Sequence, residues 1–326
     1  MSEVTICVPV YNVEKYIERC ARSLFEQTVK DLEFIFIDDC SKDGSIEVLK
    51  RVMNKYPERK GQIRIIRHDN NKGLAGARNT AVENCETEFL LHVDSDDYID
   101  LNTVEECLKN QKETGSDIVT YGVKRIKNGI ERTSIYKWNN DKEVMMKRLL
   151  RHEIGHGVCG RMIRTSLYKD NGIKVEVGRG MSEDLQVTPR LFYFAKKITY
   201  ISSVFYYYFL DNESSYVASF SIEKFRDSMA AIALIKDFFS GNKEYIDAIE
   251  FAKYKSLADN IKGCARAKAD IQIYNEVRSE FGKEHLRFFG ELDLPTKIAM
   301  RINNYRLLKL YINGAWHIKN LIKKYL

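Results

Sequence analysis

Short apolar runs alternate with longer segments of helical spacing through the first third of the chain. The runs are rich in β-branched and aromatic residues and are short enough for strands, at residues 4–12, 32–40, 63–69, 88–94 and 117–123. Between them, apolar residues recur every three or four positions, as on one face of a helix, at 14–28, 45–56, 73–85 and 102–114. Strict alternation of strand and helix is typical of βαβ units. We therefore predict an α/β fold with a mostly parallel sheet and helices on both faces.

The pattern changes twice further along the chain. From residue 124 to about 216 it is irregular and ends in an apolar run at 202–210, which predicts one more strand. From residue 221 the spacing is helical, over segments 222–239, 243–269 and 271–281. We predict two domains, a first one at 1–218 whose halves meet near residue 123, and an all-helical C-terminal domain at 219–326.

Composition and targeting signals place the chain in a broad class. It has 326 residues, of which 44% are hydrophobic and 30% charged, as in globular proteins of about two domains. The seven cysteines are scattered without a CxxC pair, which disfavours a disulfide framework or a zinc site. The first residues lack the basic and apolar stretches of a signal peptide, and no apolar run has the roughly 18 residues of a membrane-spanning helix. We expect a cytoplasmic protein, soluble or peripheral on the inner face of the membrane.

The C-terminal segment carries an unbalanced charge. The net charge of the chain is +6, and no acidic residue follows Asp293, whereas seven lysines and arginines do. Within 297–326, apolar residues can share one helical stripe: Ile298, Ile302, Tyr305, Ile312 and Trp316. A basic amphipathic helix is typical of peripheral membrane contact. The alternative is a helix packed on the protein's own core or on a second subunit of a homodimer. Nucleic-acid binding is disfavoured because no aromatic and basic groove pattern appears elsewhere.

A cluster of carboxylates follows the fourth predicted strand. The stretch "FLLHVDSDDYID" turns from an apolar run into Asp94, Asp96 and Asp97. Asp94 and Asp96, two positions apart at a strand end, can point the same way. Neighbouring carboxylates raise each other's pKa unless a cation compensates, and Mg²⁺ or Mn²⁺ would do so through oxygen ligands. The alternative is a solvated Asp-rich turn.

Other predicted strands also end in polar or aromatic residues. The first ends at Tyr11 and Asn12, and the second at Asp38 and Asp39. In open α/β sheets, ligands bind outside the carboxyl ends of the strands. These groups should therefore converge with the acidic cluster on one crevice.

Five segments, in order along the chain, carry a family resemblance. "CVPVYN", "IFIDDCSKDGS", "NKGLAGARN", "LHVDSDD" and "SEDLQ" at 182–186 together resemble the family 2 glycosyltransferases, which have the Rossmann-like GT-A fold. The resemblance covers roughly residues 4–215. It implies a nucleotide-sugar half at 1–123 and an acceptor half at 124–218. It also implies inverting transfer from a nucleotide-sugar donor, expected to be a UDP-sugar, to a glycan or lipid-linked glycan in surface-polysaccharide synthesis.

The resemblance also assigns residues to the donor. It implies that three residues line the base pocket, namely Pro9, Val10 and Tyr11, with the Tyr11 ring on the base. Asp39 would accept a hydrogen bond from the uracil imide, and Arg78 would support the base and diphosphate. Asp94 and Ser95 would lie near the ribose.

The metal and the base complete the implied set. Asp96 would bind the Mn²⁺ or Mg²⁺ that bridges the diphosphate, and Asp184 would be the general base. A metal neutralises a diphosphate leaving group, and a carboxylate that accepts the proton of a sugar hydroxyl lowers the barrier to attack. The rival interpretation is a catalytically inactive sugar-nucleotide-binding or scaffold protein. A nucleotidyltransferase or dehydrogenase is disfavoured because no Gly-rich loop follows the first strand.

Two features of the sequence depart from the family pattern. Thr188 and Pro189 are typical of a helix N-cap and first helical residue, which predicts that Asp184 lies on a loop before that helix. Cys159 and Arg161 occupy positions where relatives often carry Trp and Lys. Donor contacts from that segment are therefore not assigned.

Overall fold

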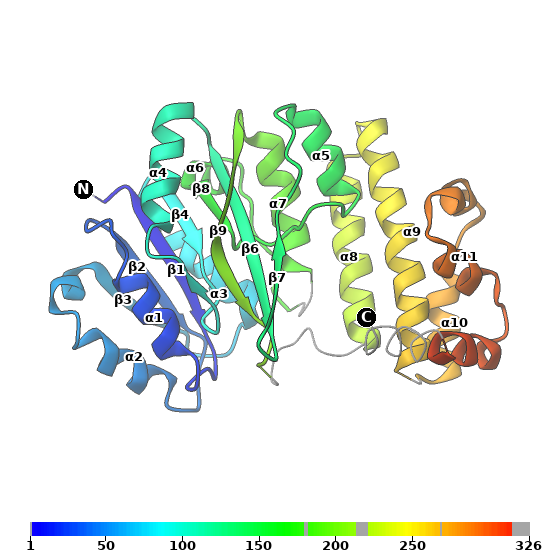
Figure 1. Ribbon diagram of the computed structural model, residues 1–326, viewed down its shortest axis with the longest axis horizontal. Coiled ribbons are helices and arrows are strands. Elements are labelled where there is room, and N and C mark those ends of the chain that lie inside the picture. Colours follow the sequence, from blue (N-terminus) through cyan, green and yellow to red (C-terminus); the bar gives the residue numbers. More distant parts are fainter. Residues whose placement is uncertain (1, 179–181, 213–220, 268, 315–326) are drawn as a thin grey trace. The chain divides into compact units, whose positions relative to one another are not determined.

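The structure is a computed structural model that describes residues 2–178, 182–212, 221–267 and 269–314. The chain forms two compact units (Figure 1). The first comprises Met1–Leu149 and Ile154–Ser215, and the second comprises Leu150–Glu153 and Tyr216–Leu326. The predicted boundary at 218/219 falls within 213–220, outside the described residues.

The first part of unit 1 has the predicted βαβ pattern. Its parallel strands lie in the order β3-β2-β1-β4, with bounds β1 Val4–Val10, β2 Glu33–Asp38, β3 Ile63–Arg67 and β4 Phe89–His92. The connecting helices are α1 Ile17–Phe25, α2 Ser45–Met53, α3 Gly73–Asn84 and, after the short β5, α4 Thr103–Thr114. A 3₁₀ helix, Pro57–Gln62, precedes β3. In Figure 1, α1 and α2 cover one face of these strands and α3 the other.

The rest of the sheet combines both strand directions. β8 Arg161–Arg164 lies between β4 and β6 Ile118–Lys127 and is antiparallel to both. On its other side, β6 pairs in parallel with β9 Ile198–Phe209. β5 Tyr98–Ile99 pairs with β9, and β7 Ile130–Ser134 forms a hairpin with β6. The predicted strand at 202–210 thus begins four residues earlier, at Ile198. The sequence pattern did not predict β5, β7 or β8.

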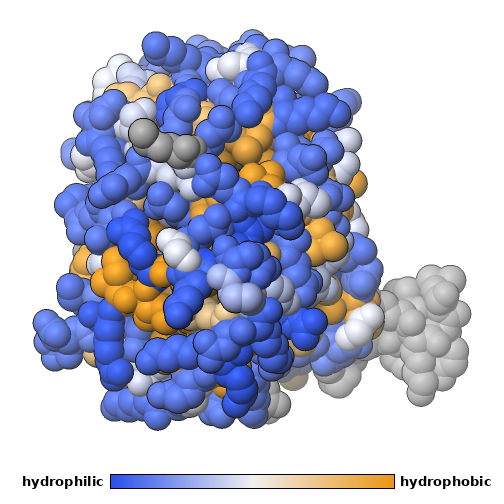
Figure 2. Space-filling model, turned by 90° about the vertical axis from the view of Figure 1, so that its left-hand side faces the viewer, coloured by the Kyte–Doolittle hydropathy of each residue, from blue (hydrophilic) through white to orange (hydrophobic). Residues whose placement is uncertain are grey.

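The core of unit 1 lies on both faces of its central strands. Every residue of β1 is buried, because a parallel strand covered by helices on both sides has no solvent face. One hydrophobic cluster joins this strand to apolar positions of α1, α2 and α4, among them Ile17, Leu24, Leu49 and Val104. All seven cysteines are free thiols in the structure. Seen from the end that carries β3, the surface is mainly hydrophilic with separate apolar patches (Figure 2).

Three further helices of unit 1 follow the hairpin: α5 Lys142–Leu150, α6 Thr165–Lys169 and α7 Glu183–Phe194. All the regular secondary structure in the described residues of unit 2 is helical, as predicted. Its helices are α8 Ile222–Phe238, α9 Lys243–Arg266, α10 Ile271–Ser279, the 3₁₀ helix Lys283–Glu291, α11 Leu294–Arg301 and a last helix over 305–314. Four of them begin at side chains that accept a backbone N–H of the first turn, namely Ser221, Asn242, Asp270 and Asp293.

The prediction of one apolar helical stripe from Ile298 to Trp316 is wrong. The helix breaks at 302–304, so the positions before and after the break do not lie on one helix. Tyr305 and Ile312 are buried in the core of unit 2, as the alternative of a core-packed helix requires, and Trp316 lies outside the described residues. No helix among the described residues is both long and apolar enough to cross a membrane.

Candidate active site

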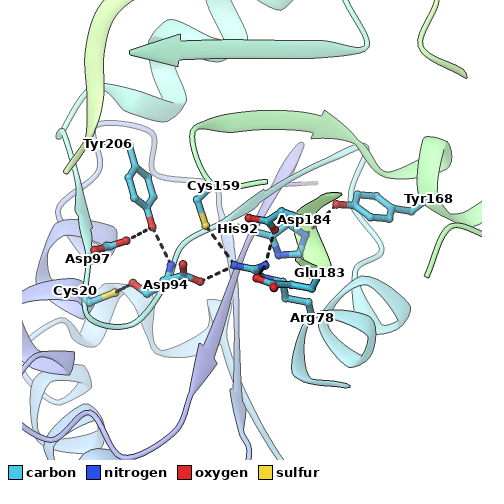
Figure 3. A network of polar contacts seen from close by, with 10 residues as sticks. All are labelled: Cys20, Arg78, His92, Asp94, Asp97, Cys159, Tyr168, Glu183, Asp184 and Tyr206. Carbon is cyan, nitrogen blue, oxygen red and sulfur yellow. Dashed lines mark hydrogen bonds and ion pairs between the residues drawn. The ribbon is translucent and has the colours of Figure 1, made fainter. Parts of the chain in front are cut away.

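The loop after β4 places the acidic cluster at the carboxyl ends of the parallel strands. The Tyr206 hydroxyl, from β9, accepts the backbone N–H of Asp94 at 3.1 Å and donates to Oδ2 of Asp97 at 2.6 Å (Figure 3). The other Asp97 oxygen accepts the backbone N–H of Phe209 at 2.7 Å. Burial and the charges of Asp94 and Asp96 raise the pKa of Asp97 well above its usual range. Asp97 therefore fixes the loop to β9 rather than facing a ligand.

Arg78 connects the acidic loop to α7. Its guanidinium, on α3, is 5% exposed and donates through Nη2 to Oδ1 of Asp94 at 3.0 Å. Through Nη1 it donates to Oε1 of Glu183 at 2.9 Å and Oδ1 of Asp184 at 2.6 Å (Figure 3). Burial by itself would lower the pKa of Arg78, but the carboxylates of Asp184 and Asp94 raise it well above its ordinary value. Arg78 and these three carboxylates thus form a largely buried charge cluster.

Asp184 has the electrostatic environment of a base that titrates near neutrality. Burial raises the pKa of Asp184 to about 7, while Arg78 pulls it down and Glu183 and Asp94 push it up. About a quarter of the Asp184 side chain stays exposed, so a ligand can reach it. A carboxylate with a pKa near the working pH is both partly ionised and basic enough to accept a proton.

The predicted loop position of Asp184 is wrong. α7 begins at Glu183, so Asp184 lies in its first turn, and Pro189 lies inside the helix. A proline there removes one backbone hydrogen bond. Buried neighbours hold the helix together across this point: Thr188 donates its hydroxyl to the carbonyl of His156 at 2.5 Å, and Leu185 is buried in the core. Tertiary packing overrides the local preference of proline.

Asp96 has an environment that suits a cation. Burial, followed by the charge of Asp94, raises the pKa of Asp96, while Asn212 donates its side-chain N–H to Oδ2 at 2.9 Å. Arg78 pairs with Asp94, whereas the Arg19 guanidinium reaches the backbone carbonyl of Asp96 at 2.8 Å. Among the described residues, no three His, Cys, Asp or Glu side chains are arranged to hold a metal by themselves. The carboxylate fits a hard cation that takes its remaining oxygens from phosphates and water.

The ends of β1 and β2 lie side by side. The backbone N–H of Asp39 donates to the Val10 carbonyl at 2.9 Å. Tyr11 follows and is 47% exposed, so its ring is not part of the core. The side chains of Pro9 and Val10 are buried, so a ligand would meet mainly their backbone.

Asp39 takes part in a hydrogen-bond chain that the sequence did not suggest. Its Oδ1 lies 2.7 Å from Nδ1 of His68 and accepts the backbone N–H of Lys72 at 2.7 Å. The other His68 nitrogen, Nε2, lies 2.9 Å from the hydroxyl of Thr80 on α3. These hydrogen bonds fix the orientation of the Asp39 carboxylate, which we predict to accept the imide N–H of uracil.

Cys159 and Arg161, which stand where relatives often carry Trp and Lys, lie beside Arg78 and α7. The Cys159 thiol is 3.9 Å from Nη2 of Arg78. Arg161 is buried, donates through Nη2 to the carbonyl of Gly155 at 2.6 Å, and its guanidinium carbon lies 5.4 Å from the ring centre of Phe192. These contacts give Arg161 a role in holding the segment between α5 and β8.

The structure therefore brings Arg78, Asp94 and Asp184 into direct contact. Asp96 and the buried Ser95 lie on the same loop, and Asp39 and Tyr11 follow the ends of neighbouring strands. Sequence reasoning missed contributors from distant segments, namely His68, Tyr206 and Asn212. Only Glu183 had a local signal, since it precedes Asp184 in "SEDLQ".

Comparison with known proteins identifies the family. Residues 5–172, which include β1 to β4 and the acidic loop, match the family model described as Glycosyl transferase family 2. The chain belongs to this family. Relatives with curated names include poly(ribitol-phosphate) beta-N-acetylglucosaminyltransferase TarS of Staphylococcus aureus, 29% identical over 72% of the chain and 40% of TarS. Poly(ribitol-phosphate) beta-glucosyltransferase of Bacillus spizizenii is 31% identical over 71% of the chain and 36% of the relative.

Solved structures support the GT-A fold. Crystal structures of Staphylococcus aureus TarS with UDP and with UDP-GlcNAc have TM-scores of 0.62 and 0.59. They share 22% and 23% identity, cover 96% and 86% of this chain, and are themselves covered to 87% and 91%. At this identity the likeness shows the fold. The chain spans about two fifths of the length of each of these two curated relatives.

Proposed function

We propose that this family 2 protein is an inverting glycosyltransferase. It would move a sugar from a nucleoside diphosphate donor to a hydroxyl of a glycan. The observation that carries the proposal is the contact of one buried guanidinium, Arg78, with both Asp94 and Asp184. This contact joins the acidic loop, where the donor would lie, to the carboxylate that would act as base.

The proposed reaction needs one base. Asp184, with its pKa raised to about 7, would accept the proton of the acceptor hydroxyl as the hydroxyl oxygen attacks the anomeric carbon. The bond to the diphosphate breaks at the same time on the opposite face of the sugar, which inverts the anomeric centre. Arg78 favours the ionised form of Asp184 and holds it in place.

The donor side would use the ends of β1, β2 and β4. Tyr11 would stack on the base, Asp39 would accept the imide N–H of uracil, and Asp94 and Ser95 would lie near the ribose. A UDP-sugar is the favoured donor, since the structures of TarS contain UDP and UDP-GlcNAc.

Asp96 would hold a divalent cation, Mn²⁺ or Mg²⁺, together with the donor phosphates. When bound, the cation would neutralise the negative charge that develops on the leaving diphosphate. A mannosyltransferase of Pyrobaculum calidifontis with the same fold, at a TM-score of 0.55, was solved with GDP-Man and Mn²⁺.

The acceptor would be a surface glycan or a lipid-linked glycan. The names of the curated relatives extend this class to poly(ribitol-phosphate) chains. A cytoplasmic enzyme that works at the inner face of the membrane, as a monomer or homodimer, fits such an acceptor.

Asp184→Asn tests the proposal against an inactive binding protein. The amide keeps the shape of the side chain but accepts no proton, so kcat for transfer from a UDP-sugar in Mn²⁺ should fall roughly 10²- to 10⁴-fold. Donor affinity, measured by calorimetry, should change little. A wild-type protein that binds UDP-sugars but neither transfers nor hydrolyses them would support the inactive binding protein. A near-normal rate in the variant would move the base elsewhere, with Glu183 the first candidate.

A further inference from the structure

The last two described helices of unit 2 expose apolar side chains. On α11, Leu294 is 69% exposed and Ile298, one turn later, is 39% exposed. On the helix over 305–314, Leu307 and Leu310 are 57% and 71% exposed. Residues three or four apart lie on the same side of a helix, so each helix carries a short apolar stripe that faces solvent.

The two stripes belong to neighbouring segments of the same unit. The Tyr311 hydroxyl donates to the backbone carbonyl of Pro295 at 3.2 Å, which joins the second helix to the first turn of α11. The two most exposed leucines, Leu294 and Leu310, directly precede these two residues in the chain. Both helices are anchored from their other sides, since Ala299 and Leu308 are buried in the core of unit 2. Figure 1 shows the two segments in orange and red.

Each stripe is flanked by two cations at helical spacing. Lys297 and Arg301 lie on α11, and Arg306 and Lys309 on the next helix. The contacts of three of them are with uncharged groups: the Gly290 carbonyl and the rings of Phe289 and Tyr305. No Asp or Glu follows Asp293 in the sequence, so the positive charge of this segment is not balanced within it.

We propose that the two stripes, Leu294 with Ile298 and Leu307 with Leu310, form one face with their flanking cations, and that this face docks the protein reversibly on an anionic lipid surface. Exposed leucines enter the boundary between headgroups and acyl chains, and lysines and arginines contact lipid phosphates. It is not the stripe that the sequence predicted, because Tyr305 and Ile312 belong to the core.

Charge favours lipid over a second copy of the chain. A two-fold symmetric interface sets the same patch of each copy against itself, so four cations would face four others. A soluble polyanion would be attracted by the cations but would gain nothing from the leucines. The proposal concerns binding alone and does not depend on the transferase activity.

Vesicle co-sedimentation of the full chain tests the proposal. The protein should bind vesicles rich in phosphatidylglycerol, bind pure phosphatidylcholine weakly, and dissociate as salt rises because the charges are screened. Leu307→Ser with Leu310→Ser should weaken binding roughly tenfold or more, since apolar burial is lost. Arg306→Gln with Lys309→Gln should weaken it roughly fivefold for each charge. Circular dichroism should show an unchanged fold, because the side chains replaced by serine are more than half exposed.

Matched controls make a negative result decisive. Ile130→Ser, at a position 62% exposed on β7, and Lys109→Gln, at an exposed position on α4, should leave binding unchanged. Equal binding of wild type and the double leucine variant would overturn the proposal, whether residues 315–326 or another surface then binds the vesicles. Binding to heparin that depends on the cations but not on the leucines, without vesicle binding, would assign the face to a polyanion. A change of oligomeric state in the leucine variant, with vesicle binding intact, would assign it to a subunit interface.

Discussion

At the scale of single residues, Arg78 is the cation that links the carboxylates of the candidate site. Its two terminal nitrogens contact carboxylates from different segments, Asp94 on one side and Glu183 and Asp184 on the other. The single positive charge of Arg78 cannot neutralise three carboxylates. The remaining negative charge would stabilise a further cation near Asp96. In the proposed reaction, Arg78 would therefore position the base and also contact the donor side.

Arg78 should also set the pH dependence of transfer. The base works when ionised, so kcat should fall as the pH drops below about 7, the pKa of Asp184. Arg78 lowers that pKa, so Arg78→Gln should raise it and move the acidic limb of the kcat profile upward by roughly one to three pH units. Arg78→Lys, which keeps a cation, should move it less. An unmoved limb in Arg78→Gln would mean that the limb reports a group other than Asp184.

At the scale of elements, the pairing of β6 with β9 aims the side chains that support the acidic loop. The register shifts on both sides of Gly122, so β9 gains extra residues opposite β6 at that point. Such a bulge changes the face to which the following residues point. Beyond it, Tyr206 pairs with Val123 and reaches both Asp94 and Asp97. The bulge therefore links sheet geometry to the site.

Gly122 should tolerate no side chain. A Cβ there would lie 2.9 Å from the backbone oxygen of Ser203, which cannot rotate away. Gly122→Ala should lower the free energy of unfolding by about 1–3 kcal/mol, as overpacking typically does, in urea denaturation. Gly61→Ala is the matched control: nothing lies within 4 Å of its Cβ, so its effect should stay within about 0.5 kcal/mol. Equal effects of the two changes would show that the close approach of Gly122 to β9 does not determine the loss of unfolding free energy.

At the scale of the whole molecule, neither unit is one continuous stretch of the chain. Leu150–Glu153 lies within the sequence of unit 1 but belongs to unit 2. Arg151 in this segment places its guanidinium carbon 3.7 Å from the ring centre of Phe251 and pairs with Glu153 and Glu291. Unit 2 is thus completed by a piece of chain that precedes it by more than sixty residues.

Arg151→Ala should destabilise unit 2. The variant loses a partly buried cation–π contact together with two ion pairs, so the free energy of unfolding should fall by about 1–3 kcal/mol. Arg226→Ala is the control, because its ion pair with Glu276 is exposed and weakened by solvent, so its loss should destabilise the protein less than Arg151→Ala does. Hydrogen exchange resolved by segment should show the loss in α9. A loss confined to unit 1, or no loss, would contradict the assignment of this segment.

The sequence by itself determined the strands and α-helices from residue 4 to 114, except β5, and the acidic cluster after β4, but not the 3₁₀ helix Pro57–Gln62. Local periodicity sufficed there, because a strand buried on both faces and an amphipathic helix each leave a pattern within about ten residues. The family motifs also pointed to Asp94, Asp96 and Asp184, since these positions lie next to recognisable strand or helix ends. The all-helical character of unit 2 was readable for the same reason.

Only the tertiary structure decided what touches what. The contact of Arg78 with Asp184 joins residues 106 positions apart, and that of Tyr206 with Asp97 joins residues 109 apart. β8 enters between β4 and β6 as a strand of four residues, too short for a reliable period. Packing also overrode the local signal of Pro189 and put Tyr305 in the core while leaving Leu310 exposed. The physical reason is common to all of these: a local pattern reports which side chains avoid water, whereas their partners are set by how distant segments pack together.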